Sequence, residues 1–280
     1  MTRPAVLRYA AFTDDPAGGN PAGVVLEAAG LDEDAMLTVA ADVGYSETAF
    51  VTGRTGERDF ALRYFSPRAE VSFCGHATVA TAVALAERLG PGGLTFHTPA
   101  GVVPVEVTDD GGYAATLTSV RPYVEPVEDA DVAEAVAALG WRWSELDPAL
   151  PPRIAYAGAR HLVLAAATRA RLADLDYDFD VLERYMTARD LTTVQLVWRE
   201  TADVFRVRDP FPVGGVVEDP ATGAAAAAFG AYLRELGERS HGRLTLHQGD
   251  DLGRPGVLRV ELREGDPAVR VSGRAVPITA

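Results

Sequence analysis

The chain has 280 residues, with 26 basic and 40 acidic side chains, a formal net charge of −14 and 48% hydrophobic residues. This is the composition of a globular protein of one large or two smaller domains, and its acidity argues against nucleic-acid binding, which needs clustered cations. Every basic residue is arginine, which excludes pyridoxal-phosphate enzymes and P-loop nucleotide sites, because both need a lysine.

The sequence also predicts a cytoplasmic protein that makes no membrane contact. Its longest apolar run, Ala224–Leu233, is too short to span a bilayer, and the N-terminal residues lack the apolar core of a signal peptide. The single cysteine, Cys74, cannot form an internal disulfide, as is usual in a reducing compartment.

Hydrophobic periodicity predicts short strands interspersed with helices along the whole chain. In the first half we expect strands at 6–12, 23–26, 60–65, 95–97 and 102–107, and helices at 32–43 and 75–89. In the second half we expect helices at 132–139, 180–189 and 220–236, and strands at 160–166, 194–198 and 204–207.

The predicted helices 75–89 and 220–236 are both rich in alanine and poor in charge, which indicates burial. Both end in a Leu–Gly pair, and the two leucines are 236 − 89 = 147 residues apart, near half the chain. This spacing suggests two similar halves, with chance recurrence as the alternative. The helix starts at Gly75–His76 and Thr222–Gly223 would present backbone N–H groups that attract a carboxylate, unless both are simply capped.

Two acidic residues can each be interpreted either as catalytic or as purely structural. Glu47 precedes the apolar run 48–52, and a carboxylate in apolar surroundings suits a general base, although most glutamates at strand ends are solvated. Asp219 precedes Pro220, which predicts a helix N-cap with proline at the first helical position. A capping carboxylate keeps one oxygen for a ligand, so Asp219 is a site candidate as well.

The run Cys74–Gly75–His76 places a thiol and an imidazole at a helix start, which favours the thiolate. We expect no metal, because the other histidines stand at no short ligand spacing from this pair. A racemase that uses two cysteines is excluded by the single cysteine. The chain also lacks the G-x-G-x-x-G motif of dinucleotide-binding folds and the G-x-S-x-G motif of α/β-hydrolases. The remaining possibilities are cofactor-free acid–base chemistry on a small anion, or no catalysis.

Eight motifs in order give the sequence a specific resemblance over nearly its whole length. The chain resembles the PhzF-like phenazine-biosynthesis family of isomerases and predicted epimerases. The matching segments are Phe12–Asp14 with Gly19–Val25, Ser46–Val51, Tyr64–Pro67, Phe73–Thr78, Thr98–Gly101, Glu218–Gly223, Gln248–Gly249 with Gly253–Pro255, and Val271–Val276.

The resemblance implies an α+β, diaminopimelate epimerase-like fold of two similar lobes, each a β-barrel around a central helix. We expect the first lobe at 1–118, joined by the last strand at about 267–280, the second at 119–266, and the active site between them. A homodimer without cofactor, acting on a small anionic substrate, is implied too. The residues matching the family's acid–base machinery are Glu47, His76 and Asp219, and those matching its substrate-binding positions are Asn20, Gly75, Gly223 and Ala224.

One departure from the family pattern concerns the substrate. The family usually has serine after Thr–Gly, where this chain has Ala224, so a hydroxyl contact is lost. Cys74 stands where cysteine-based epimerases of this fold carry a catalytic thiol, and we match it with Pro220 in the other half, which cannot act.

Three functions follow from these residues. The first is an isomerase in which Glu47 alone removes and returns a carbon-bound proton. The second is an epimerase that uses Glu47 and Asp219 as two bases on opposite faces of one carbon. The third is a non-catalytic small-molecule binding protein on the same fold, suggested by Ala224.

Overall fold

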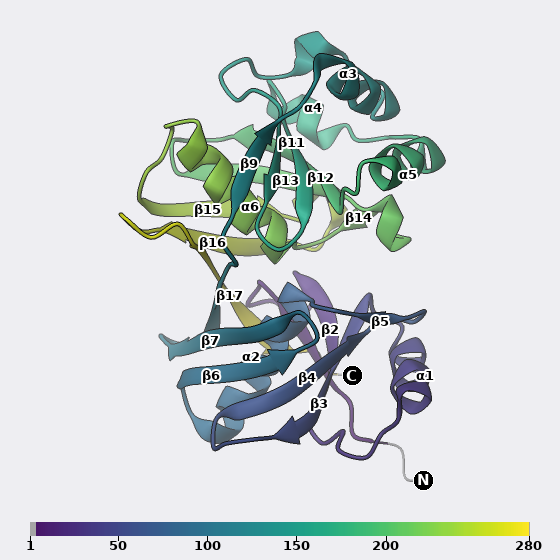
Figure 1. Cartoon of the computed structure of the whole chain (residues 1–280), viewed down its shortest axis with the longest axis vertical. Helices are drawn as coiled ribbons and strands as arrows, with labels where there is room; N and C mark the ends of the chain where they lie inside the picture. The colour runs from purple at the N-terminus through teal and green to yellow at the C-terminus, as the bar shows by residue number, and fades with distance from the viewer. Residues whose placement is uncertain (1–3, 280) are drawn as a thin grey trace. The chain divides into compact units, whose positions relative to one another are not determined.

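A computed structural model describes residues 4–279 (Figure 1). The chain divides into two compact units, residues 1–118 together with 272–280, and residues 119–271. None of the helices within residues 4–279 combines the length and apolar character needed to cross a membrane. Each unit is described by itself below.

The first unit is a closed ring of eight strands. Going round the ring, β1 pairs with β2, β2 with β3, β3 with β4, β4 with β6, β6 with β7, β7 with β8, β8 with β17, and β17 again with β1. The short β5 lies against the end of β4. The strands are β1 (Leu7–Ala11), β2 (Asn20–Val25), β3 (Glu47–Arg54), β4 (Asp59–Phe65), β5 (Glu70–Val71), β6 (Gly92–Thr98), β7 (Gly101–Asp109), β8 (Tyr113–Thr118) and β17 (Val269–Pro277).

Helix α2 (Gly75–Leu89) contacts strands on several sides of this ring and is buried along most of its length. Its Ala, Thr and Val side chains allow backbones to approach closely, which is why a helix without a large apolar stripe can be enclosed. It ends where predicted, at Leu89, and Gly90 follows with φ 78°. The second helix of the unit, α1 (Glu33–Val43), packs on the outside of β3 and β4.

The second unit has a corresponding sheet of seven strands, in the order β9-β10-β11-β12-β13-β15-β16. The short β14 lies against the end of β13, as β5 lies against β4 in the first unit. Helix α6 (Gly223–Glu235) contacts β9, β10, β11 and β16 and is buried on nearly all sides. The strands are β9 (Tyr123–Pro126), β10 (Arg153–Tyr156), β11 (Arg160–Ala165), β12 (Thr193–Arg199), β13 (Val204–Pro210), β14 (Glu218–Asp219), β15 (Gly242–Gln248) and β16 (Gly256–Leu262).

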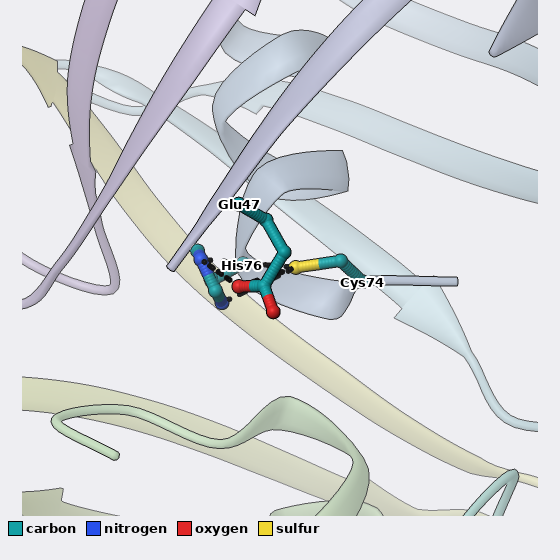
Figure 2. A group of neighbouring side chains, drawn as sticks. All are labelled: Glu47, Cys74 and His76. Atoms are coloured by element: carbon teal, nitrogen blue, oxygen red, sulfur yellow. Dashed lines mark hydrogen bonds and ion pairs between the residues drawn. The ribbon is translucent and has the colours of Figure 1, made fainter. Parts of the chain in front are cut away.

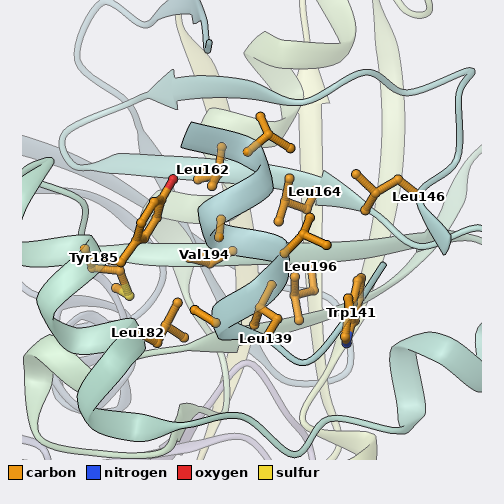
Figure 3. Close-up of a cluster of buried hydrophobic side chains, with 14 of the residues drawn as sticks. Leu139, Trp141, Leu146, Leu162, Leu164, Leu182, Tyr185, Val194 and Leu196 are labelled. Atoms are coloured by element: carbon orange, nitrogen blue, oxygen red, sulfur yellow. The ribbon is translucent and has the colours of Figure 1, made fainter. Parts of the chain in front are cut away.

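Three further helices of the second unit cover the other face of its sheet: α3 (Asp129–Ala138), α4 (Arg169–Ala173) and α5 (Phe179–Ala188). Between them and β11 and β12 lies a leucine-rich core (Figure 3). Leu182 of α5, Leu162 of β11 and Leu196 of β12 belong to this core, and all three are fully buried. The strands β11 and β12 are therefore buried on both faces, as their near-continuous apolar sequences require.

The two units share one topology. From β1 to β7 the pairings are antiparallel, parallel, antiparallel, parallel and antiparallel, and the series from β10 to β16 is the same. The expected α+β fold of two similar lobes, each with strands around a central helix, is confirmed. The two central helices start 223 − 75 = 148 residues apart, close to the spacing of the Leu–Gly pairs.

The shared register corrects one correspondence drawn from the sequence. Tyr64 pairs with Val71 in the first unit as Asp209 pairs with Asp219 in the second, and each central helix begins four residues after this pair. Cys74 therefore corresponds to Thr222, the residue before the start of α6, and its match with Pro220 was wrong.

Candidate active site

Glu47, Cys74 and His76 form a tight cluster in the first unit (Figure 2). His76 Nε2 lies 3.3 Å from Glu47 Oε2, and the Cys74 thiol donates to the same oxygen over 3.7 Å. Cys74 Sγ is also 3.4 Å from His76 Nδ1. The side chains are largely shielded from water, since His76 is 7% and Glu47 16% exposed. A carboxylate, an imidazole and a thiol thus share one partly closed volume.

Two neighbouring elements bring these three groups together. Glu47 is the first residue of β3, which runs parallel to β2 with Glu47 opposite Ala22. Cys74 is the N-cap of α2, and His76 stands on its first turn. The chain reaches β3 through Gly44, whose φ of 73° ends α1 in the left-handed conformation that glycine adopts most readily. The alternative of a fully solvated glutamate at a strand end is wrong for Glu47.

His76 is oriented by two further side chains. Asn20 Nδ2 lies 3.1 Å from His76 Nδ1, and Ser46 Oγ lies 3.4 Å from Nε2. With the Asn20 amide in this orientation, its N–H donates to Nδ1, so Nε2 carries the imidazole proton and lies 3.3 Å from Glu47 Oε2. The sequence singled out Asn20, whereas Ser46 was missed because only its contact in the fold distinguishes it from other serines.

The start of α2 is braced from inside the unit. The Thr78 hydroxyl donates to the Cys74 carbonyl over 2.6 Å and bonds to the Tyr64 hydroxyl over 2.7 Å. Burial raises the pKa of Tyr64, which keeps the phenol neutral. Among the described residues, the Cys74 side chain accepts no capping hydrogen bond from the helix. The first backbone N–H groups of α2, including that of Gly75, are therefore the groups that an anion would meet.

Asp219, Gly223 and Ala224 belong to the second unit, and Asp219 does not cap α6. It lies in β14, α6 begins only at Gly223, and Thr222 is the N-cap, so the predicted helix start at Pro220 was wrong. Pairing of β14 with β13 holds Asp219 in extended backbone, which outweighs the local capping preference of an Asp–Pro pair. The Asp219 carboxylate instead accepts a hydrogen bond from the Thr222 hydroxyl at 2.5 Å.

Gln248, at the end of β15, clamps this segment. Its amide donates to the Asp219 carbonyl over 2.8 Å and to the Thr222 hydroxyl over 3.0 Å, and it accepts from the Thr222 N–H over 3.0 Å. Gly249 must be glycine, since a Cβ there would lie 2.3 Å from the Arg254 carbonyl and 2.8 Å from that of Pro220. The sequence showed Gln248–Gly249 only as a family motif, because the clamp joins residues 26 positions apart.

A buried polar group lies behind Asp219. Asp209 is fully buried, accepts from Thr193 Oγ1 over 3.1 Å, and stands opposite Asp219 in the β13–β14 pair. Burial first, and the neighbouring Asp219 second, raise the pKa of Asp209 well above its usual value. His161 bonds to the same threonine hydroxyl over 2.8 Å, and burial lowers its pKa to about 3. His161 is therefore neutral near pH 7.

The residue next to Asp219 is held by an ion pair. Arg208 donates through Nε and Nη2 to the Glu218 carboxylate over 2.5–3.1 Å, and Arg208 Nη1 donates to the Ala173 carbonyl over 2.8 Å. The Glu218 side chain is 1% exposed, and burial raises its pKa despite the guanidinium. A buried pair of this kind fixes geometry more than it adds stability. It ties β14 to β13 and so positions Asp219.

From the sequence we expected no metal, because no third possible ligand is close to Cys74 and His76 along the chain. The fold supplies one in Glu47, which the spacing along the chain could not show because it lies 27 residues upstream of Cys74. Asn20, Gly75 and these three residues are thus the part of the predicted site that the first unit gathers in one place.

Residues 9–280 match the model of the phenazine biosynthesis-like protein family. The chain belongs to this family. An uncharacterized isomerase of Bacillus subtilis is 32% identical over 99% of this chain and 97% of its own length. A trans-2,3-dihydro-3-hydroxyanthranilate isomerase of Pseudomonas chlororaphis is 29% identical over 95% of this chain and 94% of its own.

A solved structure agrees with this assignment. The crystal structure of a PhzF-family phenazine biosynthesis protein of Bacillus anthracis matches with a TM-score of 0.89 at 27% identity, over 98% of this chain and 96% of that one. The resemblance seen in the motifs is confirmed, and the chain is a member of a family of isomerases.

Proposed function

We propose that the protein is a cofactor-independent isomerase in which Glu47 removes a carbon-bound proton from a small carboxylate-bearing substrate and returns it to another carbon. The observation that carries this proposal is the Glu47–His76–Asn20 chain, in which one carboxylate is shielded from water and contacts an imidazole that Asn20 orients. A general base needs that combination of position and partial desolvation.

The reaction balances without a further reagent. The substrate C–H bond breaks, its proton moves to a Glu47 carboxylate oxygen, and the electron pair spreads into an adjacent unsaturated system. Glu47 then delivers the same proton to a second carbon of that system, so the double bond shifts and the enzyme returns to its starting state. Contact with His76, whose Nε2 lies 3.3 Å from Glu47 Oε2, keeps the carboxylate in place through both transfers.

The substrate class follows from the chemistry of the helix start and from the family. The N-terminal N–H groups of α2, near Gly75, suit a carboxylate. The relative from Pseudomonas chlororaphis acts, by its name, on trans-2,3-dihydro-3-hydroxyanthranilate, a carboxylate whose dihydro ring has saturated C–H groups beside unsaturated carbons. We further propose that Asp219, Gly223 and Ala224 contact the substrate and that the protein is a homodimer, which sedimentation equilibrium tests.

The reaction is tested by proton NMR in deuterium oxide. The full chain is incubated with trans-2,3-dihydro-3-hydroxyanthranilate and a panel of small hydroxy- and amino-acid carboxylates. A shifted double bond, with deuterium appearing at the new C–H position only as far as Glu47 exchanges with solvent, supports the single-base isomerase. Deuterium entry with inversion at one carbon supports the two-base epimerase instead. Binding without any exchange or product would contradict both.

A further inference from the structure

We propose that Glu47, Cys74 and His76 form a binding site for a thiophilic divalent cation, with Zn²⁺ as the best fit. Three ligand atoms face one another, Glu47 Oε2, Cys74 Sγ and His76 Nε2 (Figure 2). Their separations are 3.3 Å between oxygen and nitrogen, and 3.7 Å from sulfur to each of the other two. Zinc bonds of about 2.0–2.3 Å in tetrahedral geometry separate ligand atoms by about 3.3–3.6 Å. The three separations therefore match those between ligand atoms around one ion.

The donor set selects the class of cation. A thiolate with an imidazole nitrogen suits zinc and its neighbours in the transition series, whereas magnesium and calcium prefer oxygen ligands alone. The thiolate and the carboxylate supply two negative charges, which neutralise a divalent ion at this site, where the side chains are largely shielded from water. The N-terminal end of α2 stabilises the thiolate that the cation needs.

Asn20 provides the outer support that histidine ligands usually have. Its side-chain amide lies 3.1 Å from His76 Nδ1. If the Asn20 amide rotates so that its oxygen faces Nδ1, that oxygen accepts a hydrogen bond from the Nδ1–H group. The lone pair of Nε2 is then available for the metal. One side chain thus supports both imidazole tautomers, the one with its proton on Nε2 and the one that binds a cation.

The site is open rather than structural. Within residues 4–279, no fourth histidine, cysteine, aspartate or glutamate joins the group, so water or an anion completes the tetrahedron. Because the cation holds the Glu47 oxygen that His76 otherwise contacts, the loaded protein has no free base at this position. We infer a reversible cation-binding site, and this inference concerns binding alone, whether or not Glu47 transfers a proton.

The test uses cobalt chloride and zinc chloride on the full chain. Because Cys74 is the only cysteine in the sequence, a near-ultraviolet sulfur-to-cobalt charge-transfer band reports on it alone. We expect this band in the wild-type protein and its disappearance when zinc is added. By calorimetry, zinc affinity should fall at least about tenfold in Cys74→Ser and in Glu47→Gln, and about ten- to a hundredfold in Asn20→Ala.

The matched control is His97→Ala, which removes an exposed histidine whose Nε2 lies 3.8 Å from Asp59. Its cobalt band and zinc affinity should equal those of the wild-type protein. Absence of the band from the wild-type protein, or zinc affinity that is unchanged in both Cys74→Ser and Glu47→Gln, would overturn the proposal. If circular dichroism shows that Cys74→Ser does not fold, the wild-type band and Glu47→Gln decide the question.

Discussion

The two units have the same strand pairings and the same central helix, but they carry different chemistry on them. By the shared register, Glu47 corresponds to Thr193, Cys74 to Thr222 and His76 to Ala224. The acidic residue of the second unit, Asp219, corresponds to Val71 in the first. The two units therefore carry their candidate carboxylates at places that are not equivalent.

This difference explains how one fold can support one-base chemistry. In the first unit the carboxylate is at a strand start, next to an imidazole and a thiol. In the second unit a threonine hydroxyl and a glutamine amide fix the carboxylate segment, with the buried Asp209 behind it. Two equivalent bases would suggest a symmetric racemase, whereas two different surroundings suggest different roles.

The largest effect should come from removing the base of the first unit. Glu47→Gln keeps the shape of the side chain but cannot accept a proton, so turnover should fall on the order of a hundred- to ten-thousandfold while the fold persists. The control is Glu57→Gln, an exposed glutamate of the same unit, which should keep normal turnover. Turnover of Glu47→Gln equal to that of the control would remove Glu47 from the mechanism.

The second prediction concerns acid sensitivity, which should reside in the second unit. Burial lowers the pKa of His161 to about 3 in the folded protein, against 6.5 in the unfolded chain. The corresponding residue of the first unit is Ala22, which pairs with Glu47 as His161 pairs with Thr193 and which does not titrate. The stability that neutral His161 contributes is present above pH 6.5 and is lost as pH falls toward 3, by a few kcal/mol at about 1.4 kcal/mol per pKa unit.

Urea unfolding at pH 7 and pH 5 measures this loss. The drop in unfolding free energy should be smaller in His161→Asn, which cannot titrate, whatever the stability of that variant at pH 7. Hydrogen exchange should locate the acid-sensitive amides on β11 and β12. An equal drop in both proteins would show that His161 does not control the acid response.

A smaller effect is expected from Asp219→Asn. Asparagine can still accept the hydrogen bond from the Thr222 hydroxyl, and Asp219 caps no helix. The free energy of unfolding should therefore differ from that of the wild-type protein by less than about 1 kcal/mol. Turnover should nevertheless fall roughly ten- to a hundredfold if the negative charge matters to the substrate. Asp176→Asn, an exposed residue of the same unit, serves as control. Unchanged turnover would leave Asp219 with a structural role only.

The smallest effect should come from Ala224→Ser, which restores the hydroxyl usual in the family. Serine costs only a few tenths of a kcal/mol in a helix, while a hydrogen bond to a charged group is worth roughly 1.5–3 kcal/mol. Calorimetry with several small carboxylates should show about tenfold tighter binding of those that suit the common family site. If no carboxylate changes affinity in either direction, Ala224 does not line the substrate site.

The sequence predicted what local physics controls and missed what depends on distant pairing. Alanine content and a following glycine were enough to define α2 from Gly75 to Leu89. The start of α6 was wrong by three residues, because β13 draws Asp219 into a strand that no local pattern marks. Likewise, the residues of the first cluster were all singled out, but only the fold shows that Glu47 completes a group of three ligands.

The last strand of the chain has a consequence for biosynthesis. The ring of the first unit closes through β17, and the residues that close it follow the whole of the second unit, residues 119–271. On the ribosome, the first unit therefore keeps an unpaired edge at β1 until β17 has been synthesised, whereas the second unit is by then available in one continuous piece. We expect that nascent chains fold their later half first, and that chains stalled before residue 272 expose an edge strand that chaperones must protect.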